Sequence, residues 1–228
     1  MITLFTSHKR LLLTTSYLLL LAVAAGTYLA GWVIHEQLLT EPGSGDAFYA
    51  RDATLWSKHQ TMLSANYNLT ANHPYASHWW SWPLMVRSVF YWQDDGAAIY
   101  FLGNPIVWWG SLLLAVVAVA ALVRTVARPG PLSGVGWLPL VGFLIAFIPL
   151  VRVPRPLFLY HYLTPLLFSL VFGLLWLDGR LTSSARRQVV LTLSLAVLVA
   201  FVLFSPLTYG FKAPATWQQN LFWLSSWR

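Results

Sequence analysis

The sequence predicts an all-α polytopic membrane protein with about five transmembrane helices. Of its 228 residues, 57% are hydrophobic and only 9% are charged, and the mean hydropathy is +0.61. A soluble globular domain carries roughly a quarter charged residues. Several uncharged stretches also approach or exceed the ~20 residues that a helix needs to cross a bilayer. We therefore expect a single membrane domain over residues 1–228.

The apolar stretches define the predicted spans. The first and second stretches are long enough to span alone, whereas the third and fourth are shorter but lie within longer uncharged runs. A long polar and aromatic loop, residues 35–104, separates the first two spans. The predicted spans are near 11–33, 105–123, 136–151, 163–177 and 189–207.

The basic residues predict the orientation of these spans. Short cytoplasmic loops carry an excess of Lys and Arg, which predicts a cytoplasmic N-terminus and an outer C-terminus. The residues that carry this bias are Lys9, Arg10, Arg124, Arg128, Arg180, Arg186 and Arg187. A second interpretation stays open for the first stretch, where Ala22-Val23-Ala24 resembles a signal-peptide cleavage site. Both interpretations leave the 35–104 loop on the outer face.

Composition excludes several kinds of site. The chain has no cysteine, which excludes disulfides, zinc–thiolate sites and cysteine nucleophiles. Its net charge is +7, but the basic residues form no nucleic-acid-binding motif, so no nucleic-acid partner is expected. His73 and His78 have no carboxylate nearby in sequence, and no dinucleotide or phosphate-binding glycine motif is present. We predict neither a metal nor a cofactor, and interpret Asp94 and Asp95 as solvated loop acids.

The outer loop contains most of the polar and aromatic side chains. Trp79, Trp80 and Trp82 lie in the run 73–87, and their rings are suited to stacking on a sugar or holding a lipid headgroup. The alternative is an aromatic belt at the membrane surface. Polar residues within the run, including Arg87, favour a site. We also expect an amphipathic surface helix over 50–67 and an interfacial helix or aromatic belt over 211–228.

Four positions admit a functional and a structural interpretation. The guanidinium of Arg87 or Arg155 matches phosphate oxygens, but either can also be a snorkelling arginine. His161 lies near the start of a span, where an ionisable group favours a function, and the alternative is a satisfied structural histidine. Asn104 precedes Pro105 and is sufficiently explained as a helix cap.

Four motifs follow one another along the chain: His73-Pro-Tyr-Ala-Ser77, Trp80-Ser-Trp-Pro-Leu84 followed by Arg87, Gly103-Asn-Pro-Ile-Val-Trp-Trp109, and Phe158-Leu-Tyr-His-Tyr-Leu163. In this order they resemble the protein O-mannosyltransferase family, whose enzymes use polyprenyl- or dolichyl-phosphate mannose. The resemblance covers most of the chain but corresponds only to the C-terminal half of such an enzyme. One departure is Ser88, where the family often has proline.

The resemblance implies a membrane glycosyltransferase with its active site at the outer face. Mannose passes with inversion from lipid phosphate to a Ser or Thr hydroxyl, and a carboxylate acts as general base. In the family this carboxylate belongs to an Asp-Glu pair in the N-terminal half, so no catalytic residue is assigned in this chain. The residues implied to bind the lipid phosphate or sugar are His73, Tyr75, Trp82, Arg87, Asn104, Arg155, Tyr160 and His161.

The expected partners are a polyprenyl-phosphate sugar donor, membrane lipid, and an N-terminal catalytic half or subunit. The expected location is a bacterial plasma membrane, with the long loop outside the cytoplasm. We expect the chain to be the C-terminal part of a protein mannosyltransferase, as a fragment, a split-gene product or the product of a truncated gene model. The alternatives are a non-catalytic membrane subunit that binds a lipid-linked sugar, and a related transferase that acts on a glycolipid.

Overall fold

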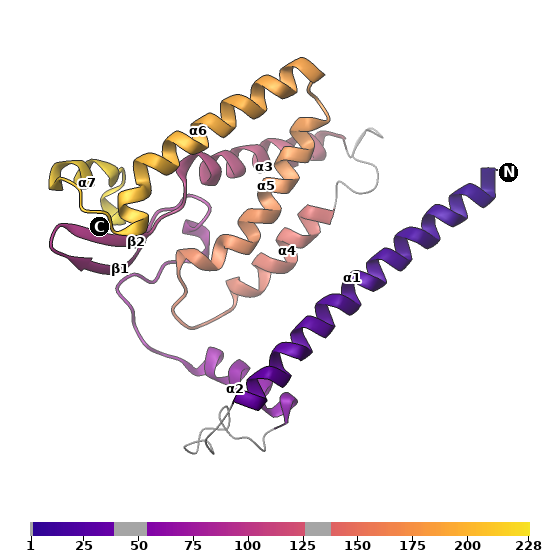
Figure 1. Ribbon diagram of the computed structural model, residues 1–228, viewed down its shortest axis with the longest axis horizontal. Coiled ribbons are helices and arrows are strands. Elements are labelled where there is room, and N and C mark those ends of the chain that lie inside the picture. Colours follow the sequence, from indigo (N-terminus) through magenta and orange to yellow (C-terminus); the bar gives the residue numbers. More distant parts are fainter. Residues whose placement is uncertain (1, 39–53, 126–137) are drawn as a thin grey trace. The chain divides into compact units, whose positions relative to one another are not determined.

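The computed structural model describes residues 2–38, 54–125 and 138–228. These form two compact units, Met1–Tyr67 and Asn68–Arg228, and most of the described residues are helical (Figure 1). Three helical segments are long and apolar enough to cross a membrane, and α3 and α4 are shorter apolar helices. The helices over the apolar stretches are α1 (Ile2–Leu38), α3 (Pro105–Thr125), α4 (Leu138–Val151), α5 (Leu163–Asp178) and α6 (Ser183–Tyr209).

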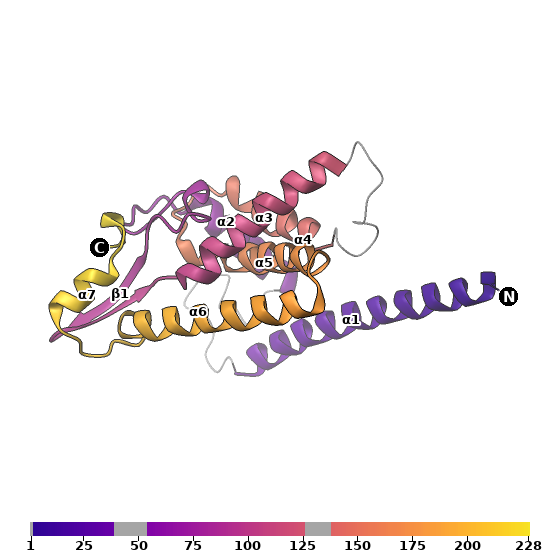
Figure 2. The same cartoon turned by 90° about the horizontal axis from the view of Figure 1, so that it is seen from above.

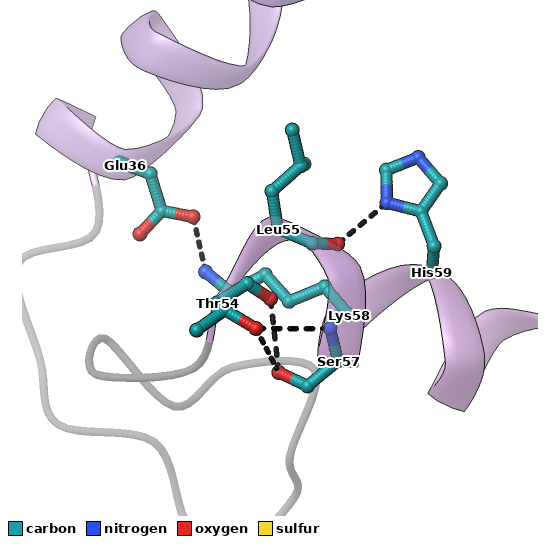
Figure 3. Close-up of polar contacts among 6 residues, drawn as sticks. All are labelled: Glu36, Thr54, Leu55, Ser57, Lys58 and His59. Carbon is teal, nitrogen blue, oxygen red and sulfur yellow. Dashed lines mark hydrogen bonds and ion pairs between the residues drawn. The ribbon is translucent and has the colours of Figure 1, made fainter.

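The first unit consists of α1 and α2 (Leu55–Asn68). The Thr54 hydroxyl caps α2 by accepting a hydrogen bond from the Ser57 backbone N–H at 3.1 Å, so the helix begins later than the expected residue 50. Residues 50–53 lie outside the described part. The side chain of Lys58 is fully buried and forms an ion pair with Glu36 (Figure 3). Because an unpaired buried ammonium is costly, this pair holds α2 against the end of α1.

The second unit has a helical bundle in which both α3 and α4 pack against α5. Gly173 permits the close approach of α3, because a Cβ atom there would lie 2.5 Å from the Cβ of Leu114. Gly142 does the same between α4 and α5, where a Cβ would lie 2.4 Å from a ring carbon of Phe168. Small residues at helix contacts are typical of membrane bundles.

A β-hairpin follows the aromatic run, so the expectation of an all-α fold was too narrow for this segment. Strands β1 (Val89–Asp94) and β2 (Ala97–Phe101) are antiparallel. Asp95 and Gly96 join them with φ values of 33° and 77°, the two positive values of a type I′ turn. Asp-Gly after a run rich in aromatic residues is a hairpin signal. Strand β2 packs against α6.

Short elements complete the second unit, namely η1 (Trp79–Ser81), η3 (Leu159–Tyr162), α7 (Ala215–Leu221) and η4 (Ser225–Trp227). The expected interfacial helix or belt over 211–228 is only partly found. Trp223 is 51% exposed, as a belt residue would be, but Trp227 is fully buried in the core. The belt interpretation was therefore wrong for Trp227, whose indole forms an internal hydrogen bond.

The close contact at Gly173 predicts a stability difference between two matched substitutions. Gly173→Ala should destabilise the bundle by about 1–3 kcal/mol, because α3 and α5 must separate. Gly110→Ala in α3 is the control: a Cβ there meets nothing within 4 Å, and alanine should raise stability by about 0.5–1 kcal/mol. Thermal unfolding midpoints in detergent measure both. Equal midpoints for the two variants would contradict this packing.

Candidate functional site

Three tryptophans hold the backbone of the segment that leads to Arg87. The indole N–H of Trp108 donates to the carbonyl of Trp82 at 2.7 Å, and that of Trp109 donates to Leu84 at 3.0 Å. The indole N–H of Trp227 donates to the carbonyl of Met85 at 2.6 Å. Met85 has a φ of 52°, a left-handed conformation that is unfavourable for a non-glycine residue. The indole bonds fix this turn from α3 and from η4.

Two hydroxyl groups add to this attachment. The Ser88 hydroxyl donates to the carbonyl of Trp227 at 2.5 Å, and the Ser226 hydroxyl donates to the carbonyl of Val86. Ser88 is the position where the resembling family often has proline. A proline would supply no hydroxyl here, so serine gives this chain an extra tie between the outer segment and its C-terminal residues.

Phe158 connects most of the predicted site residues through ring contacts. Its ring centroid lies 4.9 Å from that of His73 and 5.3 Å from that of Tyr160. The His161 ring stacks on Tyr160 at 4.7 Å and on Trp82 at 6.1 Å. Phe158 begins one of the four motifs but was not among the predicted site residues, because a phenylalanine near a transmembrane span is usually a core residue. Its position directly before Tyr-His-Tyr was the available signal.

Arg87 joins this cluster through Tyr75. The Tyr75 ring lies 6.1 Å from that of His73, and the guanidinium carbon of Arg87 lies 5.9 Å from the centroid of Tyr75. Tyr75 also stacks on Phe90 of β1 at 5.8 Å. The predicted residues other than Asn104 thus lie in one network of contacts, which we call the Phe158 cluster: His73, Tyr75, Trp82, Arg87, Arg155, Phe158, Tyr160 and His161.

His161 and Arg155 form the polar part of the cluster. Nη2 of Arg155 lies 3.3 Å from Nε2 of His161, and Nδ1 of His161 lies 3.1 Å from the carbonyl oxygen of Phe158. A guanidinium can only donate hydrogen bonds. Nε2 of His161 therefore accepts from Arg155, which fits a neutral imidazole, while Nδ1 lies 3.1 Å from both the backbone nitrogen and the carbonyl oxygen of Phe158. His161 orients the guanidinium without neutralising its positive charge.

Ser77 fixes Trp82 and joins the two segments of the cluster. Its hydroxyl accepts a hydrogen bond from Nε1 of Trp82 at 2.9 Å, and its backbone N–H donates to the carbonyl of Leu157 at 2.8 Å. Trp82 is fully buried. It therefore acts as a packed support for the His161 ring, and the belt interpretation does not hold for this tryptophan.

An open cleft of about 690 Å³ lies beside the cluster, between segments 70–79 and 150–157. Its described lining includes His73, Ser77, His78 and Arg155 and contains no carboxylate. An arginine at the wall of such a cleft can bind an anion that enters from outside.

Both arginines of the cluster lack a counterion among the described residues. The buried Nε atoms of Arg87 and Arg155 have no hydrogen-bond partner there, and no salt bridge joins either side chain to a described carboxylate. By contrast, Arg186 pairs with Asp178 at 2.6 Å. Half-buried guanidinium groups that no described carboxylate neutralises are suited to a phosphate ligand.

Asn104 has a structural role in the described contacts. Its Oδ1 accepts hydrogen bonds from the backbone N–H groups of Ile106 and Val107 at 3.0 and 3.3 Å, which is a helix cap for α3. Its Nδ2 donates to the carbonyl of Val197 in α6 at 2.9 Å. These bonds occupy both ends of the amide and tie α3 to α6.

An apolar groove of about 430 Å³ lies among α3, α4 and α5. Two of its lining residues, Pro83 and Tyr162, directly follow Trp82 and His161 in the sequence. The groove therefore starts next to the Phe158 cluster. Its other lining residues are Leu112, Ala115, Val116, Val119, Ala120, Leu140, Phe143, Ser169 and Phe172.

Tyr100 of β2 borders the cluster on the hairpin side, 5.2 Å from Phe90 between ring centroids. Burial raises the pKa of its phenol above the ordinary value, and the neighbouring Tyr75 raises that pKa further. The Tyr100 phenol is therefore neutral at physiological pH and adds no negative charge near Arg87.

The sequence of this chain is similar to those of known proteins. Residues 53–227 match the model of the C-terminal four-transmembrane region of protein O-mannosyltransferase. The chain is 30% identical to dolichyl-phosphate-mannose–protein mannosyltransferase 1 of Candida albicans over 80% of this chain and 24% of that protein. It is 31% identical to the polyprenol-phosphate-mannose–protein mannosyltransferase of Corynebacterium glutamicum over 75% of this chain and 36% of that protein.

A solved structure with a similar fold is the Saccharomyces cerevisiae protein O-mannosyltransferase Pmt1–Pmt2 complex bound to the sugar donor. The match has a TM-score of 0.68 and 28% identity and covers 77% of this chain and 27% of that one. The chain thus spans between a quarter and just over a third of the length of these relatives.

We predict that the hydrogen bond from the indole N–H of Trp227 to the Met85 carbonyl stabilises the segment that leads to Arg87. Trp227→Phe keeps an aromatic ring but leaves the Met85 carbonyl without its donor, which should cost about 1–3 kcal/mol. Amide hydrogen exchange over residues 85–89 should accelerate. Trp223→Phe is the control, because Trp223 is half exposed. Unchanged exchange in Trp227→Phe would show that the bond does not hold the turn.

Proposed function

The chain belongs to the protein O-mannosyltransferase family, and we propose that its Phe158 cluster binds the phosphate end of a polyprenyl-phosphate mannose donor. The full enzyme would transfer the mannose to Ser or Thr hydroxyls of proteins. The observation that carries this proposal is the pair of arginines, Arg155 and Arg87, whose buried Nε atoms have no partner among the described residues. The relatives named above are lipid-phosphate-mannose enzymes, which supports a phosphate ligand.

Arg155 is the best placed to hold the phosphate. It lines the cleft and is oriented by His161. During transfer, the bond between the sugar and the phosphate oxygen breaks, and negative charge develops on the phosphate. A fixed guanidinium stabilises that charge without reorganisation. Arg155 would therefore act on the leaving group, while Arg87 would attract the donor from the far side of Tyr75.

The apolar groove is suited to the isoprenoid chain of the donor. It begins at Pro83 and Tyr162, next to the cluster, and its lining is almost wholly apolar. A phosphate at Arg155 would leave the attached chain close to this entrance. The alanines Ala115 and Ala120 leave room on the α3 side of the groove.

The general base would come from outside these 228 residues, from the rest of a longer chain or from a partner subunit. None of the described carboxylates lines the cleft. Glu36, Asp95 and Asp178 are each ion-paired with a basic residue, and Asp94 ends β1 beside the hairpin turn. Removal of the acceptor proton during attack on the sugar carbon requires a base within hydrogen-bond reach.

The membrane arrangement that fits this function has the cluster at the outer face. The family region and the apolar helices make the chain an integral membrane protein. We propose five spans with a cytoplasmic N-terminus, residues 35–104 outside the cytoplasm, and a bacterial plasma membrane as the location. The basic residues Arg180, Arg186 and Arg187 between α5 and α6 support this orientation.

A second candidate is a membrane module that binds the lipid-linked sugar without catalysing transfer. The observation that favours it is the absence of a carboxylate from the described lining of the cleft. The two candidates differ when the chain is co-expressed with a polypeptide that carries the Asp-Glu loop of the family. Mannose transfer to a Ser/Thr peptide by the pair supports the enzyme, and no transfer by two folded parts supports the module.

The proposed phosphate contact predicts a specific loss of donor binding. Arg155→Gln should weaken binding of polyprenyl-phosphate mannose by about 10- to 100-fold, since a charged hydrogen bond contributes about 1.5–3 kcal/mol. Arg155→Lys should recover only part of the lost donor affinity, because lysine lacks the planar guanidinium that can form two parallel hydrogen bonds with a phosphate. Titration of the donor into the protein in lipid nanodiscs measures the affinity.

Arg152→Gln is the matched control. Arg152 carries the same charge on the same loop, but its side chain is exposed, so its loss should change the affinity by less than about twofold. Equal weakening by Arg152→Gln and Arg155→Gln would mean that only the net charge matters, and would remove Arg155 from the site. Arg87→Gln should also weaken binding while leaving membrane insertion intact.

A further inference from the structure

We propose that the edge of β1 that is unpaired among the described residues docks the acceptor polypeptide, which pairs with it in an extended conformation as a third strand. This inference rests on the proposed function, because it assigns the second substrate of the same enzyme. The occupant is a stretch of extended polypeptide that carries Ser or Thr. Recognition through backbone hydrogen bonds is largely independent of sequence, which suits an enzyme that modifies hydroxyl residues in many contexts.

The two strands of the hairpin have different partners among the described residues. Strand β2 packs against α6, and in Figure 1 and Figure 2 β1 lies on the side of the hairpin away from α6. Strand β1 contacts the rest of the unit through side chains such as Phe90. The turn is fastened at two points, where Lys212 pairs with Asp95 at 2.6 Å and the Gln218 side chain donates to the carbonyl of Gly96 at 2.6 Å. No described strand pairs with the outer edge of β1, so this edge can accept an added strand.

The register of the hairpin identifies which backbone groups of β1 face outward. The type I′ turn joins Asp94 and Ala97, whose backbone groups bond to each other across the turn. Bonded and non-bonded pairs alternate in an antiparallel ladder. The next pair, Gln93 with Ala98, is therefore non-bonded, and the N–H and C=O of Gln93 point away from β2. They are available to an added strand.

The exposed side chains of β1 offer contact area for that strand. Tyr91 is 56% exposed and Trp92 is 45% exposed. A β-bulge between Phe90 and Trp92 shifts the register, so that Trp92 pairs with Ile99 and Phe90 pairs with Tyr100. Trp92 and Phe90 therefore lie on opposite faces of the hairpin. Phe90 is the residue that stacks on Tyr75, so one face of the hairpin leads to the Phe158 cluster.

The path of β1 brings a docked strand to the donor site. The strand starts two residues after Arg87, and the segment before it is fixed by the indole bonds of Trp109 and Trp227. Because side chains alternate along a strand, every second residue of a paired peptide would face the cluster. A Ser or Thr at such a position would present its hydroxyl toward the sugar.

Peptides with methylated amides test the pairing. The probe is a fluorescent ten-residue peptide of alternating Thr and Val, added to the 228-residue protein in nanodiscs that contain polyprenyl-phosphate mannose. In one isomer the backbone amides of the odd-numbered residues are N-methylated, and in the other isomer those of the even-numbered residues are. Strand pairing predicts that one isomer binds like the parent and that the other binds at least about tenfold more weakly. Fluorescence anisotropy measures the affinities.

Substitutions at Gln93 provide the matched protein variants. Gln93→Pro removes the outward N–H, and an edge strand tolerates proline where its N–H faces solvent. It should weaken binding of the parent peptide by about tenfold, whereas Gln93→Ser keeps the N–H and should not. Donor affinity should stay unchanged in both variants, which shows that the hairpin and cluster remain folded.

The outcomes separate this inference from the proposed function. Equal binding of the two methylated isomers, or no peptide binding while the donor binds, overturns the docking edge alone. The edge is also overturned if Gln93→Pro leaves peptide affinity unchanged. The competing role for Tyr91 and Trp92 is contact with the membrane surface. Replacing both residues by serine would then lower partition into the membrane and leave peptide affinity unchanged. Failure of the donor to bind overturns the proposed function itself.

Discussion

The hydrogen bonds from indole N–H groups to backbone carbonyls are the constraint on which the rest of the second unit depends. The carbonyls of Trp82, Leu84 and Met85 lie in an irregular turn, outside any helix or strand, and each accepts an indole N–H. The Trp82 carbonyl also accepts the backbone N–H of Met85 at 2.9 Å. A buried carbonyl without a donor is costly. Tryptophan is a large apolar residue that also carries an N–H donor. The abundance of tryptophan in this chain therefore reflects fastening of a loop as well as the membrane surface.

This manner of fastening determines the electrostatics of the site. The turn is held by rings and neutral hydroxyls, so no carboxylate is needed near Arg87 or Arg155 to keep the fold together. Aromatic faces attract a cation weakly and do not neutralise it. The neutral imidazole of His161 orients Arg155 in the same way. The result is two half-buried positive groups that no described carboxylate neutralises, which favours the binding of an external phosphate.

The sequence predicted the apolar helices well because hydropathy and length follow directly from the membrane. It was less able to find helix ends: α6 starts at Ser183, capped by Thr182, and its polar first turns carry no hydropathy signal. The hairpin was missed although Asp95-Gly96 is a turn signal, because its strands were interpreted as membrane-surface aromatics. Among site residues, charge and motif order indicated Arg87, Arg155 and His161. The central role of Phe158 depends on contacts between distant segments, which a single sequence does not reveal.

The C-terminal segment connects the two halves of the proposed chemistry. Trp227 and Ser226 hold the turn before Arg87, and Lys212 and Gln218 hold the turn of the hairpin. Both attachments come from residues that follow α6, so the same segment holds the Phe158 cluster and the β1 edge in place. A transferase must keep donor and acceptor in a fixed relation, because small displacements reduce the rate steeply. Fixing both sites from the same short segment meets this requirement within the second unit.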